Sequence, residues 1–219
     1  MIPVITIDGP SGSGKGTLAR RLAEKLGFHL LDSGALYRLT ALAARKRNID
    51  LDDPEVAAVA QTLNVRFDPD GAAYLDDACV DSELRTEQTG AMASKIAARP
   101  DVRAALLARQ RAFAEAPGLV ADGRDMGTVV FVDAPAKLFL DASAEIRAQR
   151  RYKQLIENGL SANLTALVEE IQARDDRDRN RAIAPLVPAE DALVVDSTHL
   201  SIEAVEARMM EFIRAQGVV

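Results

Sequence analysis

The sequence predicts an α/β fold in which helices cover both faces of a largely parallel β-sheet. Short apolar runs alternate with longer segments of helical period through most of the 219 residues, which is the pattern of parallel sheets buried on both sides. The chain is 48% hydrophobic and 27% charged, an ordinary globular composition. At this length a domain with insertions can bury a sizeable core.

The elements follow in order along the chain. Apolar runs predict strands at residues 3–7, 28–31, 119–121, 137–140 and 193–195. Helical periodicity predicts helices at residues 15–26, 36–46 and from 201 to about 214. The first helix is the clearest, because Leu18, Leu22 and Leu26 recur at helical spacing and Gly27 then ends it.

Two stretches interrupt this alternation. Residues 63–84 hold three short apolar runs separated by Asp-Pro-Asp-Gly and Asp-Asp, which predicts a small antiparallel meander inserted into the α/β frame. Residues 152–164 break the helical pattern at Asn158-Gly159 and predict a mobile flap.

The composition argues against a nucleic-acid-binding protein. Acidic residues outnumber basic ones by 33 to 27, for a formal charge of −6, whereas proteins that bind DNA or RNA usually carry the opposite balance. The single cysteine, Cys79, excludes an internal disulfide and a thiolate zinc cluster. No apolar run approaches the roughly 18 residues of a membrane span, and residues 1–8 lack the pattern of a signal peptide. We expect a cytoplasmic protein with no nucleic-acid or membrane partner.

The strongest motif is a glycine-rich segment between the first predicted strand and the first predicted helix. It reads Gly9-Pro10-Ser11-Gly12-Ser13-Gly14-Lys15-Gly16-Thr17. Glycines let successive backbone N–H groups curl around an anion, and the helix N-terminus adds its positive dipole end. Lys15 is placed to reach the β- and γ-phosphates of a nucleotide. These features predict a phosphate-binding P-loop, and the strand–lysine–helix context disfavours a plain glycine-rich turn.

Thr17 stands one position later than the hydroxyl of the general P-loop motif. That motif has Ser or Thr directly after Lys as a Mg²⁺ ligand, whereas Gly16 follows Lys15 here. The sequence therefore assigns no protein ligand of the metal. The Gly-Lys-Gly-Thr ending resembles that of nucleoside monophosphate kinases.

A second motif is the charged run at residues 174–181. On a helix, one face would carry Arg174, Arg177, Asp178 and Arg181. Asp175 and Arg179 would pair on a different side. Three guanidinium groups and a carboxylate can hold phosphates and sugar hydroxyls, although a solvated, salt-bridged surface is the alternative. The P-loop favours the binding interpretation, because a nucleotide enzyme needs several cations.

Polar residues also follow two predicted strands. They are Asp122, Arg124 and Asp125 after the strand at 119–121, and Ser33 and Arg38 after the strand at 28–31. Ligands of open parallel sheets bind just beyond the carboxyl ends of the strands, so these residues are candidate substrate contacts. Asp122 is alternatively an ordinary turn residue, and Ser33 a plain N-cap.

Three other residues that often carry chemistry have a structural interpretation. His29 in an apolar strand and His199 near a helix start are expected to pack or cap. Cys79 in the meander is expected to be a small buried hydrophobic residue.

These segments together closely resemble the bacterial cytidylate kinase family. The matching segments are residues 9–17, 30–38, 121–131, 174–181, 184–189 and 196–198. The P-loop alone would suit any nucleoside monophosphate kinase, whereas the segments at 121–131 and 174–189 are much more specific. The match spans most of the chain.

The resemblance implies the architecture of the whole chain, a single domain over residues 1–219 with a three-layer P-loop kinase core and a five-stranded parallel sheet. The core would comprise residues 1–33, 113–151 and 182–219, with a region for the nucleoside monophosphate at about 34–112 that holds the 63–84 insertion, and a short lid at about 152–181. The family expectation is a monomer.

The resemblance also implies the reaction, transfer of the γ-phosphoryl group of ATP to CMP or dCMP with Mg²⁺ as cofactor. The acceptor phosphate has a second pKa of about 6 and is already a nucleophile, so no general base is required. Positioning and neutralisation of charge remain. The expected catalytic residues are Lys15, Arg124, Arg181 and Arg150 or Arg151, with ATP on residues 9–17.

The expected CMP ligands divide by the part of the nucleotide that they contact. Ser94, Arg103 and Asp125 would surround cytosine, Arg174 and Asp178 the ribose, and Arg38, Arg124 and Arg181 the phosphate, with Ser33 nearby. Two other functions stay open from the residues alone. One is another small-molecule kinase, such as an adenylate or shikimate kinase, and the other is a nucleotide-gated binding protein. The absence of an Asn-Lys-x-Asp guanine-reading motif argues against the latter.

Overall fold

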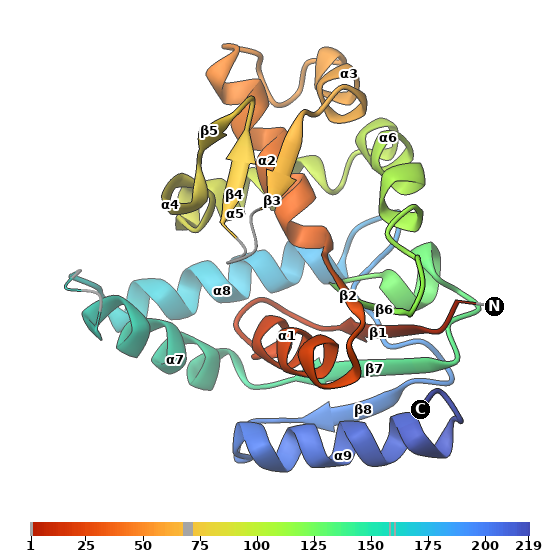
Figure 1. The fold of residues 1–219 in the computed structure, drawn as a ribbon. Coiled ribbons are helices and arrows are strands. Elements are labelled where there is room, and N and C mark those ends of the chain that lie inside the picture. The colour runs from red at the N-terminus through yellow and green to blue at the C-terminus, as the bar shows by residue number, and fades with distance from the viewer. Residues whose placement is uncertain (1, 68–71, 158, 160) are drawn as a thin grey trace. The chain divides into compact units, whose positions relative to one another are not determined.

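The computed structural model describes residues 2–67, 72–157, 159 and 161–219. The chain divides into two compact units (Figure 1). The first unit comprises Met1–Leu31 and Ala112–Val219, and the second comprises Asp32–Arg111. The described residues contain no helix long and apolar enough to cross a membrane.

The first unit is built on a five-stranded parallel sheet with strand order β2-β6-β1-β7-β8. The strands are β1 (Val4–Asp8), β2 (His29–Asp32), β6 (Leu119–Gly123), β7 (Ala136–Asp141) and β8 (Leu193–Asp196). Every residue of the central strand β1 is buried, as expected of a parallel strand covered on both faces. The carboxyl ends of β1, β6 and β7 therefore meet at one edge, where Asp8 stands beside Gly123 and Phe139.

Helices of the first unit bury the apolar side chains of this sheet. Helices α1 (Lys15–Leu26) and α9 (Ile202–Ala215) share a core with the strands, in which Ile5 and Ile7 pack with Leu22 and Met209. Helices α7 (Ala144–Glu157) and α8 (Leu164–Arg179) run side by side (Figure 1). A short π-helical turn, η1 (Met126–Val130), follows β6 and contacts β1.

The second unit combines helices with a small sheet of its own. Its helices are α2 (Ser33–Lys46), α3 (Glu55–Gln61), α4 (Asp81–Leu84), α5 (Glu87–Ile96) and α6 (Pro100–Arg111). Strands β3 (Val65–Phe67), β4 (Ala73–Leu75) and β5 (Ala78–Cys79) pair antiparallel in order. The meander expected at residues 63–84 is thus confirmed, while residues 68–71 of its first turn lie outside the described residues.

The structure corrects two strand ends. Helix α2 begins at Ser33, and Asp32 is its N-cap, because Asp32 Oδ1 accepts a hydrogen bond from Ala35 N at 2.9 Å. The N-cap interpretation of Ser33 is therefore wrong. Strand β6 extends to Gly123, so Asp122 is a buried strand residue rather than a turn residue. Pairing with β1 continues through this position and keeps the strand extended.

The expected flap at residues 152–164 is only partly irregular. Residues 152–157 belong to α7, and α8 begins at Leu164. No Gly or Pro interrupts the chain before Asn158, and Lys153 lies 3.8 Å from Glu157 one turn later, so nothing ends the helix earlier. Asn158 itself lies outside the described residues.

Candidate active site

The loop of residues 9–17 connects β1 to α1 and requires glycine at two positions for different reasons. A Cβ on Gly9 would lie 2.1 Å from the carbonyl oxygen of Leu140, so only glycine allows the loop to approach β7 this closely. Gly14 caps the N-terminus of α1 with a left-handed φ of 95°. Backbone N–H groups at the start of α1 have no intrahelical partner. Such an end favours an anion, and it stands where the sequence predicts a phosphate.

Lys15 folds back over this loop. Its side chain is largely buried, and Nζ lies 3.2 Å from the carbonyl oxygen of Pro10. Nζ also lies 3.8 Å from Oδ1 of Asp122 at the end of β6. The ammonium group is therefore held at the loop, between a carbonyl and a carboxylate, where it can meet a bound phosphate.

The Asp122 carboxylate explains why glycine follows Lys15. A Cβ at Gly16 would stand 3.2 Å from Asp122 Oδ2, tighter than ordinary van der Waals contact. Gly16 thus makes room for a buried carboxylate beside the loop, and Thr17 follows with an exposed side chain. Carboxylate and hydroxyl oxygens are the ligand type that Mg²⁺ prefers.

Asp8, at the end of β1, belongs to this site although the sequence analysis did not select it. Its Oδ1 and Oδ2 accept hydrogen bonds from the backbone N–H groups of Met126 and Gly127, each at 2.8 Å. The pKa of Asp8 is raised from its usual 3.8 to about 7. Burial is the largest cause, the charges of Asp125 and Asp122 add to it, and the two hydrogen bonds act in the opposite direction. An aspartate directly before the glycine-rich loop was the only sequence signal available.

This raised pKa predicts a pH-dependent stability. When the pKa of a group is higher in the folded than in the unfolded protein, its contribution to stability is complete below the unfolded-state pKa. That contribution is lost as the pH rises through the folded-state pKa. Between pH 3.8 and about 7, we expect Asp8 to lower the free energy of unfolding by up to about 4 kcal/mol. Asp8→Asn cannot ionise and should show a flatter profile.

The measurement is urea unfolding of both proteins between pH 4 and 8, without added metal or nucleotide. The variant should gain stability relative to the wild type as pH rises. A stability difference that stays constant across this range would show that Asp8 does not titrate there.

Arg124 and Asp178 are brought together by the fold. Arg124 Nε donates to Asp178 Oδ2 at 3.1 Å, with the carboxylate almost fully buried. The next residue, Asp125, is also buried and precedes η1, where its carbonyl accepts from Val129 N and Val130 N. The segment after β6 therefore presents a fixed arginine beside a buried aspartate.

The charged run at 174–181 is helical only as far as Arg179, which corrects two expectations. Arg181 lies beyond the end of α8, where the Asn180 side chain caps the Asp176 carbonyl at 2.8 Å. Arg181 still turns back, because its Nε donates to the Asp178 carbonyl at 3.2 Å. Asp175 and Arg179 do not pair as expected. Arg179 has its partner on β7, and Asp175 has its partner on α7.

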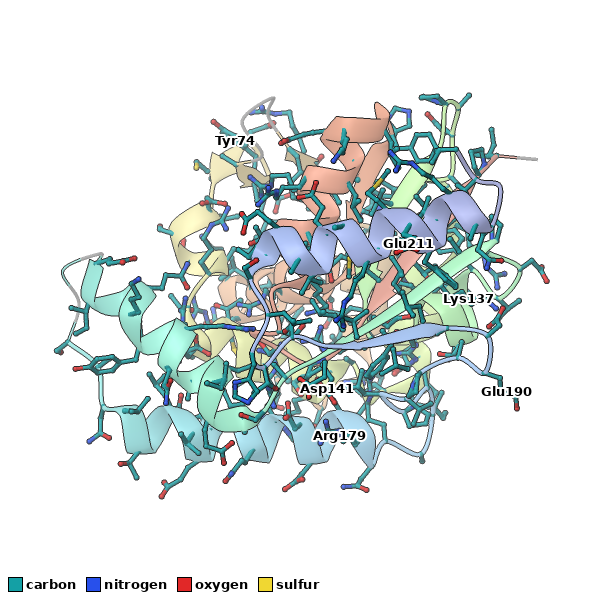
Figure 2. The ribbon with its side chains drawn as sticks, turned by 90° about the horizontal axis from the view of Figure 1, so that it is seen from below. Tyr74, Lys137, Asp141, Arg179, Glu190 and Glu211 are labelled. Atoms are coloured by element: carbon teal, nitrogen blue, oxygen red, sulfur yellow. The ribbon has the colours of Figure 1, made fainter. Side chains whose placement is uncertain are left out.

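Arg179 lies 3.5 Å from Asp141 at the end of β7, and Figure 2 shows these two side chains near one another. They line a pocket of about 520 Å³ that also holds three other aspartates, Asp175, Asp176 and Asp196. With four aspartates against two arginines in its lining, this pocket does not suit phosphates.

Arg150 and Arg151 differ in their surroundings. Arg150 of α7 donates to the carbonyl of Ser13 at 3.2 Å and to that of Ser197 at 2.7 Å. Its pKa is lowered by burial and by the nearby charge of Arg147. Arg151 Nη1 instead donates to Gln154 Oε1 on the same helix at 2.8 Å. The structure therefore brings Arg150 into contact with the P-loop at Ser13.

Four expected CMP ligands belong to the second unit. Ser33 is the buried first residue of α2, and Arg38 Nη1 donates to the carbonyls of Leu84 at 2.7 Å and Thr86 at 3.1 Å. Ser94 on α5 is 5% exposed, and Arg103 on α6 donates to the Ala97 carbonyl at 3.3 Å. Burial of a serine and an arginine in this unit argues against the surface role that helical sequence alone would suggest.

Two of the structural interpretations were wrong. Cys79 is a free, exposed cysteine on β5, a strand whose two residues are both exposed. His29 is exposed rather than packed, with its Nε2 2.9 Å from the carbonyl oxygen of Ala116.

A lysine curled over a glycine-rich loop, between a buried parallel strand and a helix N-terminus, defines a P-loop phosphotransferase. An arginine of α7 that bonds this loop and an arginine on the segment after β6 suit the transfer of a phosphoryl group. The chain belongs to the cytidylate kinase family, whose family model matches residues 5–215.

Curated relatives extend over almost the whole chain. A cytidylate kinase of Aliivibrio salmonicida is 60% identical over 218 residues, covering 98% of this chain and 97% of the relative. A cytidylate kinase of Klebsiella pneumoniae is 58% identical over 222 residues, covering 100% of this chain and 98% of the relative. A solved structure of an uncharacterized protein from Eubacterium ventriosum aligns with a TM-score of 0.51 at 12% identity, covering 97% of this chain and 99% of that one. That likeness shows the fold alone.

Proposed function

We propose that this chain transfers the γ-phosphoryl group of ATP to CMP or dCMP, giving ADP and CDP or dCDP. The observation that carries this function is the match to cytidylate kinases over residues 5–215, with identity near 60%. The P-loop with Lys15 supplies the machinery that such a transfer needs.

The proposed catalytic and phosphate-binding residues have separate electrostatic roles. The acceptor phosphate is itself the nucleophile, so catalysis consists of positioning and charge neutralisation. Lys15 would meet the β- and γ-phosphates, with Arg150 or Arg151 closing on ATP. Arg38, Arg124 and Arg181 would hold the phosphate of CMP. The geometry at Arg150, which already bonds the loop carbonyl of Ser13, supports its role.

Mg²⁺ is the proposed cofactor, and Thr17 and Asp122 are the residues that would hold it. Among the described residues no group of His, Cys, Asp and Glu side chains is arranged to bind a metal alone, so phosphate oxygens would complete its ligands. The Asp122 carboxylate beside Gly16 fits this requirement. When bound, Mg²⁺ neutralises charge on the phosphates.

The proposed CMP ligands read base and sugar separately. The N4 amino group of cytosine can donate a hydrogen bond to a carboxylate such as that of Asp125. Arg103 can donate to N3 or O2 of the base, and Ser94 would lie beside the base. Arg174 and Asp178 would bind the ribose. The burial of Asp125 and Asp178 supports these roles, because a desolvated polar site discriminates strongly.

We propose the region at about 34–112 as the part that binds the nucleoside monophosphate and the region at about 152–181 as a lid. We also propose that the protein acts in the cytoplasm as a monomer. Size-exclusion chromatography with light scattering tests the oligomeric state.

The function is tested by one coupled assay of ADP release with ATP, Mg²⁺ and a panel of acceptors: CMP, dCMP, UMP, AMP and shikimate. CMP and dCMP should give the highest kcat/KM, and EDTA should abolish turnover. ATP turnover that needs no acceptor would favour a nucleotide-gated binding protein. Preference for AMP or shikimate would assign a different kinase.

Asp178→Ala is expected to impair both CMP and dCMP, but CMP more. Asp178 would bind the ribose and also holds Arg124 at 3.1 Å, so its removal should loosen the phosphate clamp for either acceptor. We expect a loss of about 10²-fold in kcat/KM for CMP. The excess loss for CMP over dCMP measures the contact to the 2′-hydroxyl.

Asp176→Ala is the matched control, because Asp176 is exposed on the same helix. It should leave both acceptors unaffected. Equal losses for CMP and dCMP in Asp178→Ala would restrict its role to holding Arg124.

A further inference from the structure

Two arginines from two different helices converge on one residue of the P-loop. Arg147 of α7 donates from Nη1 to the Ser11 carbonyl at 2.9 Å. Arg174 of α8 donates from Nη1 to the Ser11 hydroxyl at 3.1 Å. Ser11 is therefore the point at which the loop meets the helix that carries the proposed ribose ligands.

Arg147 is a buried arginine whose guanidinium group is held in a fixed geometry. It is 1% exposed. Its Nε donates to the Ala142 carbonyl at 2.9 Å, and both Nη atoms donate to the carboxylate of Asp175. This two-pronged contact fixes the orientation of both side chains. Burying two charges costs desolvation free energy that their attraction often does not exceed. Stability alone therefore does not explain why this ion pair lies against the loop.

The loop also packs directly on the Arg147 side chain. A Cβ at Gly12 would lie 3.3 Å from the Cβ of Arg147, so the glycine lets the backbone of the loop rest on the arginine. A movement of the loop at Ser11 or Gly12 would therefore displace the Arg147 guanidinium group, and with it the Asp175 carboxylate of α8 that this group holds.

Asp175 connects this contact to the acceptor side of the reaction. It is 4% exposed on α8 and is the direct neighbour of Arg174, while Asp178 follows on the next turn. The pair Arg147–Asp175 and the contact Arg174–Ser11 thus fasten one turn of α8 to the loop at two points. Both contacts lie within the first unit.

We propose that Ser11, Arg147 and Asp175 form a positioning network that couples ATP binding to CMP binding. A nucleotide on the P-loop fixes the Ser11 backbone, and the network then holds Arg174 and Asp178 in the geometry that binds the acceptor sugar. By linkage, bound CMP raises the affinity for ATP by the same factor. Arg147 and Asp175 are positioning residues and touch neither substrate. The proposal rests on the proposed function for the ribose roles of Arg174 and Asp178.

The coupling is measured directly by calorimetry. The Kd of an unreactive ATP analogue with a β,γ-imido bridge is determined in Mg²⁺ buffer, with and without saturating CMP. The ratio of the two values is the coupling factor, which we expect to be at least about fivefold in the wild type. In Asp175→Asn, which keeps the side-chain volume but not the charge, the factor should fall toward one.

A second variant keeps the buried ion pair intact. Ser11→Ala retains the carbonyl that accepts from Arg147 and removes only the hydroxyl that accepts from Arg174. Loss of a hydrogen bond from a charged donor predicts a rise in the KM for CMP of about 10-fold. The KM for ATP should rise less than the KM for CMP, although Ser11 belongs to the ATP loop.

Glu206→Gln is the matched control for a purely structural ion pair. Glu206 is a buried carboxylate on α9, 2.7 Å from Arg21 and 3.1 Å from Lys25 of α1, and 8% exposed. This variant should lower the Tm and leave the coupling factor at the wild-type value. A merely structural role for Asp175 predicts the same behaviour.

The outcomes separate the network from the function itself. Wild-type protein that phosphorylates CMP but shows a coupling factor of one overturns the network, as does an unchanged factor in Asp175→Asn. Wild-type protein that does not phosphorylate CMP overturns the proposed function instead. If Asp175→Asn does not fold, Ser11→Ala decides, and a KM for CMP unchanged in that variant overturns the network.

Discussion

Replacing Lys15 with alanine is expected to lower kcat by about 10³-fold while the fold is retained. The ammonium group lies at the loop, 3.2 Å from the Pro10 carbonyl, where in the proposed reaction charge would develop on the transferred phosphoryl group. Its removal takes away a preorganised cation that water cannot replace in a closed site. Steady-state kinetics with ATP and CMP measure the loss, and circular dichroism checks the fold.

Lys25→Ala is the control, because Lys25 lies on the same helix, its side chain is 53% exposed, and it pairs with the Glu206 carboxylate of α9 at 3.1 Å. It should keep wild-type turnover. A Lys15→Ala enzyme with a kcat within a few fold of the wild type would contradict the assignment of the loop as the phosphate site.

Asp125→Ala is expected to lower kcat/KM for CMP by about 10²-fold and to narrow the preference for CMP over UMP. The carboxylate would accept from N4 of cytosine, whereas O4 of uracil would face it with repulsion. Removing the carboxylate therefore lowers kcat/KM for CMP and takes away the repulsion that disfavours UMP. The KM for ATP should change little, because Asp125 stands after β6 rather than on the P-loop.

The measurement is the ratio of kcat/KM for CMP to that for UMP in both proteins. Asp133→Ala, an exposed aspartate a few residues later, is the control and should keep the wild-type ratio. If Asp125→Ala left this ratio unchanged, Asp125 would not recognise the base, and that role would fall to Ser94 and Arg103. The same variant should lower the pKa of Asp8, which the Asp125 charge raises.

Local sequence was enough for the elements that carry the P-loop. The strand, the glycine-rich turn and the helix were predicted within one or two residues, because their hydrogen bonds and apolar contacts join near neighbours. The same holds for the meander, whose strands pair across short turns. The resemblance to the cytidylate kinases then supplied the five-stranded parallel sheet of the core, whereas the order of its strands came only from the structure.

The partners of individual charged residues were not predictable in the same way. The spacing of Asp175 and Arg179 suggested a pair on one helix, yet each bonds a residue of another element. Arg147 and Asp175 are 28 positions apart, and Asp8 and Met126 are 118 positions apart. Helical spacing reports which residues share a face, but not what the rest of the chain places against that face.

The sequence by itself determined the class of fold, the phosphate-binding loop and the family of this protein. These follow from short-range patterns and from motifs whose residues are contiguous. Only the tertiary structure decided that Asp8 is buried with a raised pKa, that Gly16 makes room for Asp122, and that Arg147 supports Ser11. The physical reason is that desolvation, steric room and charge pairing depend on distances between distant segments, and these distances exist only after the chain has packed.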